Sequence, residues 1–235
     1  MRINKYISES GKSSRRGADK LIAEGRIFIN GKPAEMGSQV EDGDEVLLDG
    51  KPVVIKKEYV YMALNKPVGI TSTTDPKIKS NIVDFMNYSE RVFHIGRLDK
   101  DSQGLILMTN DGDIVNEILR PEHRHEKEYI VRVDRPITPK FVKKMSEGVE
   151  ILDTRTFPCE VTQLSKYEFR IVLTQGLNRQ IRRMCSALGY TVTRLERLRI
   201  MNILLGNLPV GEWRYLTKQE KSDLFKELNY EPKEW

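Results

Sequence analysis

Asp99 is a carboxylate in a sequence context where it could take part in a reaction. Asp99 closes the tetrapeptide Gly96-Arg97-Leu98-Asp99, which follows a short apolar stretch at 92–95 and precedes a polar turn and the apolar run 105–108. This pattern predicts a strand, a tight loop and a buried strand, with the carboxylate at the edge between them. A carboxylate in such a place can act as an acid, a base or a nucleophile. Aspartate is also a common turn residue, so the pattern alone leaves both roles open.

Alternating strands and helices must position this loop. An apolar strand begins at Tyr59 and stops at the turn Lys66-Pro67-Val68-Gly69, where proline fixes φ and glycine permits a sharp bend. Apolar residues at helical spacing predict helices, and Thr138 and Thr217 are predicted caps. The predicted helices are 82–86, 113–119, 138–148, 179–188 and a last one after Thr217. The predicted strands are 92–95, 105–108, 129–133, 159–163, 168–173 and 190–198.

Arginines gather after the last of these loops. A strand ends near Thr174, a glycine-containing loop follows, and a helix begins near Arg179, with Asn178 as its predicted cap. Residues 179–199 hold six arginines against one acid, Glu196. This excess predicts a surface that faces a polyanion such as RNA.

The first 48 residues predict a small separate unit. Its predicted elements are helices at 2–11 and 15–24 and strands at 26–30 and 45–48. Ser13 or Ser14 can cap the second helix, and Asn30-Gly31 is a strong two-residue hairpin signal. Residues 49–58, which include Lys56-Lys57, are predicted to be a connector.

Composition and charge favour a soluble protein that handles a polyanion. The chain has 235 residues, 39% hydrophobic and 31% charged, which suits one ordinary domain plus a small one. The net charge is +5, but residues 1–32 carry eight Lys and Arg against three acids, whereas residues 33–58 carry three against seven. A basic patch of this kind suits nucleic acid. No stretch has the pattern of a signal peptide or a membrane span.

The cysteines and histidines predict neither a metal site nor a redox centre. Cys159 and Cys185 lie at no metal-binding or redox spacing, so we expect reduced thiols in a cytoplasmic protein. The three histidines show no ligand spacing. A Rossmann-type nucleotide enzyme is excluded because no glycine-rich phosphate loop follows a strand at the right place.

Four motifs, in order, resemble those of the pseudouridine synthases of the RsuA/RluB/RluE/RluF family, which modify ribosomal RNA. They are Lys66-Pro67-Val68-Gly69, Gly96-Arg97-Leu98-Asp99 followed by Ser102-Gln103-Gly104-Leu105, Lys127-Glu128-Tyr129, and Arg179-Gln180-Ile181-Arg182. Within this family, Asp101-Ser102-Gln103-Gly104 and the segment ending at Tyr129 are most similar to the RluF-type branch. The first unit, with its basic residues near the helix junction, is similar to the S4 RNA-binding module.

The resemblance implies an α+β protein with two domains. It predicts an S4-like RNA-binding domain at 1–48, built from two helices and a hairpin sheet, and a linker at 49–58. The catalytic domain at 59–235 would hold a mainly antiparallel mixed sheet flanked by helices.

The family also implies roles for individual residues. Asp99 takes the position of the catalytic carboxylate, Tyr129 that of the aromatic residue against the target base, and Arg182 that of the arginine paired with the carboxylate. Arg97 would fill the space left by the flipped base. The residues predicted to contact RNA are Arg97, Lys100, Arg179, Gln180, Arg2, Lys5, Lys12, Arg15, Arg16, Arg26 and Lys66. Lys66 also has a purely architectural interpretation within its turn.

Such an enzyme would flip a uridine out of RNA and isomerise it to pseudouridine, without a cofactor or a metal. The RluF-type branch implies a stem-loop of large-subunit (23S) ribosomal RNA as the substrate, with a tRNA uridine as a second one, and a monomer that does not act at a membrane. Two alternatives stay open: a non-catalytic S4-type RNA-binding or ribosome-associated protein, and a synthase that acts on small-subunit ribosomal RNA.

Overall fold

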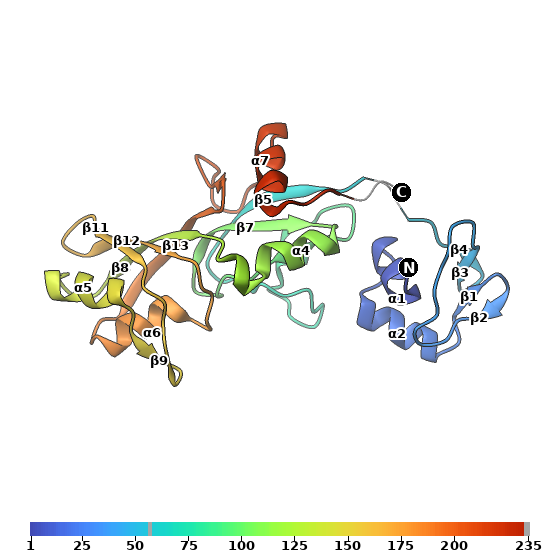
Figure 1. Ribbon diagram of the computed structural model, residues 1–235, viewed down its shortest axis with the longest axis horizontal. Helices are drawn as coiled ribbons and strands as arrows, with labels where there is room; N and C mark the ends of the chain where they lie inside the picture. The colour runs from blue at the N-terminus through green and yellow to red at the C-terminus, as the bar shows by residue number, and fades with distance from the viewer. Residues whose placement is uncertain (56–57, 233–235) are drawn as a thin grey trace.

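The chain folds into two α+β bodies. The computed structural model describes residues 1–55 and 58–232, so Lys56 and Lys57 of the predicted connector lie outside the described residues. Figure 1 shows a small N-terminal body and a larger body built on a long mixed sheet. The predicted α+β class, with a helical and hairpin unit at the N-terminus, is confirmed. Within the described ranges, every helix is too short or too polar to cross a membrane.

The N-terminal body places two helices beside a four-stranded sheet of order β2-β1-β3-β4. Its elements are α1 (Ile3–Glu9), α2 (Arg15–Ala23), β1 (Ile27–Ile29), β2 (Lys32–Pro33), β3 (Val46–Leu48) and β4 (Lys51–Pro52). Ser14 caps α2 by accepting a hydrogen bond from the Gly17 amide. Asn30 and Gly31 form the predicted hairpin turn with φ angles of +49° and +75°, which these two residue types tolerate.

A separate hydrophobic core holds the N-terminal body together. Ile3 and Ile7 of α1 pack with Ile22 of α2 and with the small sheet. Val53 is only 4% exposed and belongs to this core, and β4 pairs with β3. The structured unit therefore extends beyond residue 48, where the sequence analysis placed the start of the linker.

The larger body is organised on a nine-stranded sheet. Seven strands follow the order β11-β12-β8-β13-β7-β5-β15, while β14 pairs with β13 and β6 pairs with β7. The pair β13–β7 is parallel and the others are antiparallel, as a mainly antiparallel mixed sheet requires. The strands are β5 (Tyr61–Lys66), β6 (Phe93–Ile95), β7 (Gln103–Thr109), β8 (Lys127–Val133), β11 (Glu160–Gln163), β12 (Glu168–Leu173), β13 (Val192–Ile200), β14 (Ile203–Leu204) and β15 (Trp213–Tyr215). A hairpin of β9 (Glu150–Ile151) and β10 (Thr154–Arg155) forms its own small sheet.

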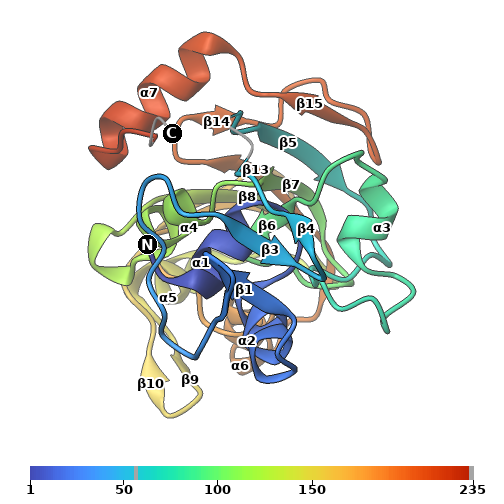
Figure 2. The ribbon, with the colours of Figure 1, turned by 90° about the vertical axis from the view of Figure 1, so that its right-hand side faces the viewer.

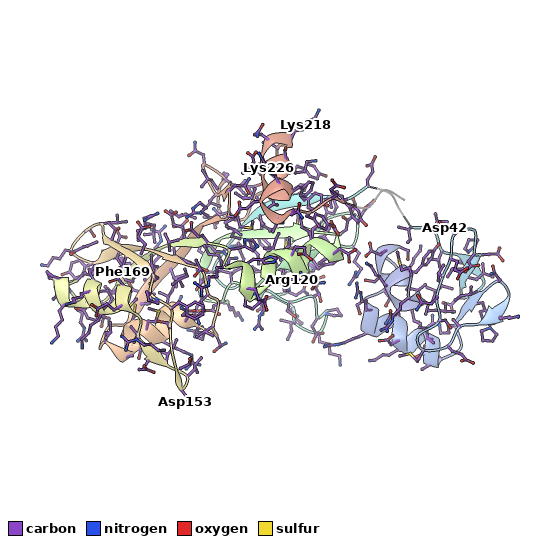
Figure 3. The ribbon with its side chains drawn as sticks, viewed as in Figure 1. Asp42, Arg120, Asp153, Phe169, Lys218 and Lys226 are labelled. Atoms are coloured by element: carbon purple, nitrogen blue, oxygen red, sulfur yellow. The ribbon has the colours of Figure 1, made fainter. Side chains whose placement is uncertain are left out.

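Helices pack on both sides of the large sheet, and Figures 1 and 2 both show α7 on the side opposite α6. The helices are α3 (Ile82–Met86), α4 (Gly112–Leu119), the 3₁₀ turn η1 (Pro121–His123), α5 (Pro139–Glu147), α6 (Gln180–Ala187) and α7 (Lys218–Leu228). The predicted caps Thr138 and Thr217 are confirmed, and Thr217 forms a full capping box with Glu220. Phe169, labelled in Figure 3, is fully buried beside Phe141 of α5, with 5.4 Å between ring centroids.

The parallel strands β7 and β13 come unusually close at one glycine. Gly104 has a φ of +114°, and a Cβ atom there would lie 2.3 Å from the carbonyl oxygen of Arg197. Only glycine allows this approach of one backbone to another. Since the Asp99 loop joins β6 to β7, the approach places Arg197 beside the C-terminal end of that loop.

Contacts of Lys5 and Glu9 on α1 join the N-terminal body to the larger one. Lys5 Nζ of α1 lies 2.7 Å from both carboxylate oxygens of Asp113 at the start of α4. The Tyr59 hydroxyl donates to Glu9 of α1 at 3.3 Å. The Lys5 cation, predicted to contact RNA, is therefore already engaged within the protein.

Asp111 ties three parts of the larger body together. Its Oδ2 accepts hydrogen bonds from the hydroxyls of Tyr61 on β5, at 2.6 Å, and Tyr230 after α7, at 2.7 Å. Its Oδ1 accepts from the Asp113 amide and so caps α4. Asp111 is 1% exposed, so replacing it leaves two tyrosine hydroxyls without their acceptor in a dry site.

We expect Asp111→Ala to lower the free energy of unfolding of the larger body by about 3 kcal/mol, because a cap and two charge-assisted hydrogen bonds are lost together. The matched variant Thr138→Ala, which removes a single cap bond from α5, should cost about 1 kcal/mol. Urea titrations followed by circular dichroism measure both. Equal losses for the two variants would show that Asp111 is only a helix cap.

Candidate active site

The predicted catalytic residues converge on one cavity of about 840 Å³. Asp99, Tyr129 and Arg182 all line it, although they come from the β6–β7 loop, β8 and α6. The Asp99 side chain is 34% exposed and Tyr129 is 9% exposed, so the carboxylate opens to the cavity while the ring is set into its wall. Arg97 and Lys100, at the same loop, also line the cavity and keep solvent contact.

The backbone of the Asp99 loop is held at every carbonyl from Gly96 to Asp101. The Gly96 carbonyl accepts from His94 Nδ1 at 2.6 Å, in the tautomer with Nδ1 protonated, and the Arg97 carbonyl accepts from Arg197 Nη1 at 3.4 Å. The Leu98 carbonyl accepts from Ser72 Oγ at 2.7 Å, and the Asp99 carbonyl accepts from the Ser102 amide at 3.0 Å. The Lys100 carbonyl accepts from the Gly69 amide at 2.7 Å, and the Asp101 carbonyl accepts from Arg182 Nη2 at 2.8 Å. Six consecutive carbonyl groups with partners leave this loop little freedom to move. The geometry of the carboxylate is therefore fixed before any ligand enters.

Ser72 holds the residue immediately before Asp99 at two points. Its hydroxyl donates to the Leu98 carbonyl at 2.7 Å and accepts from the Leu98 amide at 3.1 Å. Ser72 is 7% exposed and lines the cavity. It begins a surface loop that Thr71 and Ser80 close through backbone and side-chain bonds.

Arg197 links the loop to the tyrosine. The side chain is 3% exposed, its Nε donates to the Leu105 carbonyl at 2.7 Å, and its Nη1 donates to Arg97 of the loop. The guanidinium carbon lies 6.0 Å from the ring centroid of Tyr129. The sequence pattern marks Arg197 only as one member of a basic run, and it contains no signal for the role of Ser72.

The charge partner of Asp99 differs from the predicted one. Arg179 lies 3.7 Å from the Asp99 carboxylate and also grips Asp101 with two bonds of 2.9 and 2.8 Å. Arg182, the predicted partner, instead donates to the Asp101 carbonyl and to Ser102 Oγ at 3.0 Å. The physical reason is the helix start: α6 begins at Gln180, and Arg179 precedes it in a left-handed conformation without a side-chain cap, with φ +50°.

Asp101 is the carboxylate that organises these arginines. The hydrogen bonds from Arg179 hold the pKa of Asp101 below its usual range, and Arg182 adds to this effect. The same bonds raise the pKa of the Arg179 guanidinium. Asp101 therefore stays ionised and keeps Arg179 beside Asp99. The predicted cap Asn178 does not cap α6; its oxygen atoms accept from Arg183.

Beside the site, Lys66 is buried and Lys127 is half-buried. Burial, helped by the nearby Arg197 charge, lowers the pKa of Lys66 to about 8. Lys127 shows the same shift, also to about 8 and from the same two causes. Lys66 is 0% exposed and donates to the carbonyls of Pro67 and Ile70. This burial removes Lys66 from the predicted RNA-contacting set and favours its architectural interpretation.

Other predicted RNA contacts divide into exposed and engaged side chains. Gln180 is 5% exposed and bonds the Leu177 amide and Gln175, so it orders the loop instead of facing RNA. Arg26 is exposed but its guanidinium grips Asp49 and Glu24. The other predicted RNA-contacting residues that are exposed in the N-terminal body are Arg2, Lys12, Arg15 and Arg16.

The arginine-rich stretch 179–199 does not form one RNA-facing surface. Arg197 is buried, and Arg199 binds Glu126 and Glu128 away from the cavity. Arg194 pairs with Glu196. The predicted surface is therefore reduced to the arginines at the start of α6.

The thiols and acidic groups provide no metal centre in the described ranges. Cys159 and Cys185 are both free, and burial raises the pKa of Cys185 to about 12. Among the residues that the structure describes, no group of three or more His, Cys, Asp or Glu side chains could hold a metal ion. The chemistry that the cavity offers comes from a carboxylate, a guanidinium and a phenol ring.

Comparisons with known proteins agree with this arrangement. The family model "RNA pseudouridylate synthase" matches residues 60–187, and the S4 domain model matches residues 1–53. The dual-specificity RNA pseudouridine synthase RluF of Escherichia coli (strain K12) is 58% identical over 96% of this chain and 79% of its own length. The ribosomal large subunit pseudouridine synthase B of Bacillus subtilis (strain 168) is 35% identical over 93% of each chain.

A solved structure extends the likeness to the whole fold. The crystal structure of a pseudouridylate synthase superimposes with a TM-score of 0.70 and 31% identity, over 95% of this chain and 99% of the other. At this coverage the match spans both bodies of the chain. The chain belongs to the RNA pseudouridine synthase family, and it is an isomerase with an S4 domain at its N-terminus.

Proposed function

We propose that this pseudouridine synthase modifies a uridine in a stem-loop of large-subunit (23S) ribosomal RNA and also a tRNA uridine. The relatives at 58% identity are named dual-specificity synthases, and one at 35% is named for the large ribosomal subunit, which supports this pair of substrates. The observation that carries the proposal is the convergence of Asp99, Tyr129 and Arg179 on a single cavity.

The reaction is an isomerisation that balances without a second reactant. The N1–C1′ bond of uridine breaks, the uracil turns, and a C5–C1′ bond forms, while N1 gains a proton and C5 loses one. We propose that the Asp99 carboxylate meets the nucleotide at this step. It would stabilise positive charge at C1′, remove the C2′ proton or add to C6 of the base, and its place in the cavity suits each of these roles.

Two arginines support Asp99 in different ways in this proposal. Arg179 pairs directly with the Asp99 carboxylate at 3.7 Å. Arg182 acts through the backbone, since it holds the Asp101 carbonyl and Ser102. The predicted catalytic pairing of Asp99 with Arg182 is thus replaced by a division of labour between the two.

A stacked base must leave the helix before Asp99 can reach its ribose. Unstacking costs a few kcal/mol, and a side chain that enters the gap recovers part of this cost. Arg97 is exposed beside the cavity, two residues before Asp99, and we propose that it fills the gap. The Tyr129 ring, backed by Arg197, is positioned to stack on the flipped uracil.

We also propose a cytoplasmic monomer. Asp99, Tyr129 and Arg179 reach the same cavity from different elements of one chain, which supports a monomeric enzyme. Both cysteines are free thiols, as in proteins of reducing compartments. A non-catalytic RNA-binding role is disfavoured by family membership, and a small-subunit substrate is the alternative that the first experiment separates.

Asp99→Asn should abolish pseudouridine formation while RNA affinity stays within about tenfold, because one carboxylate contributes none of the phosphate contacts. Pseudouridines should be mapped in ribosomal RNA and tRNA from cells that carry the wild-type gene, the Asp99→Asn gene or neither. We expect large-subunit and tRNA sites that depend on wild-type Asp99. Sites confined to small-subunit RNA would overturn the choice of substrate, and turnover by Asp99→Asn would overturn the role of the carboxylate.

Ser72→Ala should lower kcat by about 100-fold with KM within about threefold, because the carboxylate shifts while the RNA-binding surface is unchanged. Ser72→Thr, which keeps the hydroxyl, should recover part of the loss. Ser80→Ala is the matched control, since Ser80 closes the same loop through Thr71 without touching residues 96–101. A rise in KM with unchanged kcat would show that Ser72 binds RNA and does not position Asp99.

The double variant Arg15→Gln/Arg16→Gln should reduce the slope of log Kd against log salt concentration by about 1.5, because two exposed cations no longer displace counterions. Arg26→Gln should leave the slope nearly unchanged, since Asp49 and Glu24 already neutralise that guanidinium. Filter-binding titrations over a range of salt concentrations measure both. Equal effects per residue would mean that RNA pulls Arg26 from its acids.

A further inference from the structure

The cavity that holds Asp99 also reaches an exposed aromatic ring. Phe157 lines this cavity and is 42% exposed, although it belongs to none of the family motifs. The guanidinium carbon of Arg124 lies 5.2 Å from the ring centroid. A cation therefore covers one side of a ring that remains open to solvent elsewhere.

The backbone around Phe157 is fixed, so the ring is held in the open and does not fold onto the core. The Phe157 amide donates to Gln175 Oε1 at 3.1 Å, and the buried Gln180 donates to the same oxygen at 3.2 Å. Thr156 is 2% exposed; its amide donates to the Val149 carbonyl at 3.0 Å, and its hydroxyl accepts from the Val149 amide at 2.9 Å. Phe157 is thus bound to the loop that precedes Arg179, and little freedom remains to be lost when a ligand contacts the ring.

The surroundings of the ring suit RNA. Arg120, labelled in Figure 3 near the end of α4, lines the same cavity, and Arg124 follows it in the exposed segment after η1. At about 840 Å³ the cavity is near the upper end of the range for ligand sites, about 300–1,000 Å³, and so has room beyond one flipped nucleotide.

We propose that Phe157, with Arg124 stacked on its ring, forms a subsite for an unpaired RNA base that neighbours the target uridine. The inference rests on the proposed function, in which Asp99 and Tyr129 receive the flipped uridine in the same cavity. Guanidinium, phenyl ring and base would form three layers, an arrangement common in single-stranded RNA recognition. Such a subsite favours target uridines in loops or bulges, where a neighbouring base is free to stack.

The test is a double-mutant cycle between the ring and the base. Stem-loops that the wild-type enzyme modifies are prepared with an abasic residue at each position on either side of the target uridine. One abasic substitution should lower kcat/KM of the wild type by about 5- to 150-fold, the range for loss of one base stacked on an aromatic side chain. Phe157→Ala should show the same loss with intact RNA and almost no further loss with that abasic RNA.

Matched variants separate stacking from general damage. Phe157→Trp keeps an aromatic face and should retain activity within about threefold. Phe85→Ala removes a comparably exposed ring, 37% exposed on α3 and outside the cavity lining, and should behave as the wild type. Phe157 is exposed, so its replacement should leave the urea midpoint unchanged, which confirms that the fold is intact.

Two results would overturn the subsite. In the first, Phe157→Ala keeps the wild-type kcat/KM on an RNA that the enzyme modifies. In the second, the loss of kcat/KM caused by Phe157→Ala and the loss caused by the abasic residue are independent, so that they multiply for every abasic RNA. Failure of the proposed substrate looks different, because the wild-type enzyme itself would then leave the large-subunit and tRNA stem-loops unmodified.

Discussion

The hydrogen bonding of six consecutive carbonyl groups is the constraint on which the site depends. Residues 96–101 form no regular structure, yet their carbonyl oxygens receive donors from segments as distant as Ser72, Arg182 and Arg197. Because each of these carbonyl groups has a donor, turning any of them toward the core without a partner would destabilise the loop. The large sheet can thus be viewed as the frame that brings these donors to one place, and the Asp99 carboxylate as the group whose position they fix.

Arg197 and the buried Lys66 place positive charge behind the site. Their hydrogen bonds go to carbonyl groups, and no acid among the described residues pairs directly with either cation. The lowered pKa of Lys66 reflects the cost of burying its charge. Asp101 carries a negative charge, but Arg179 neutralises it through two hydrogen bonds. Among the described residues that line the cavity, Asp99 is the one carboxylate, and its basic setting suits a polyanionic substrate.

Local patterns predicted the elements well because they depend on local causes. Ser14 and Thr138 cap helices through their own neighbours, and Asn30-Gly31 turns the chain without outside help. The pairing of side chains depends on contacts between distant segments, and there the sequence was less informative. Lys66 appeared exposed because a turn motif follows it, whereas the turn folds its own carbonyls over the ammonium group. Arg182 was predicted to pair with Asp99 from its position in a motif, although Arg179, the left-handed residue before the helix, is the one that reaches Asp99.

The two arginines near the end of β13 show why such errors arise. In a regular strand Arg197 and Arg199 would point to the same face, two residues apart. The pairing of β13 with β8 shifts register between them, and this bulge turns Arg197 toward Tyr129 while Arg199 binds Glu128 on the opposite face. The residue types in β13 do not predict this bulge. The bulge arises because β13 pairs with β8 on one side and approaches Gly104 of β7 on the other. A single inserted residue in the pairing therefore decides which arginine supports the active site and which one stabilises the outer face of the sheet.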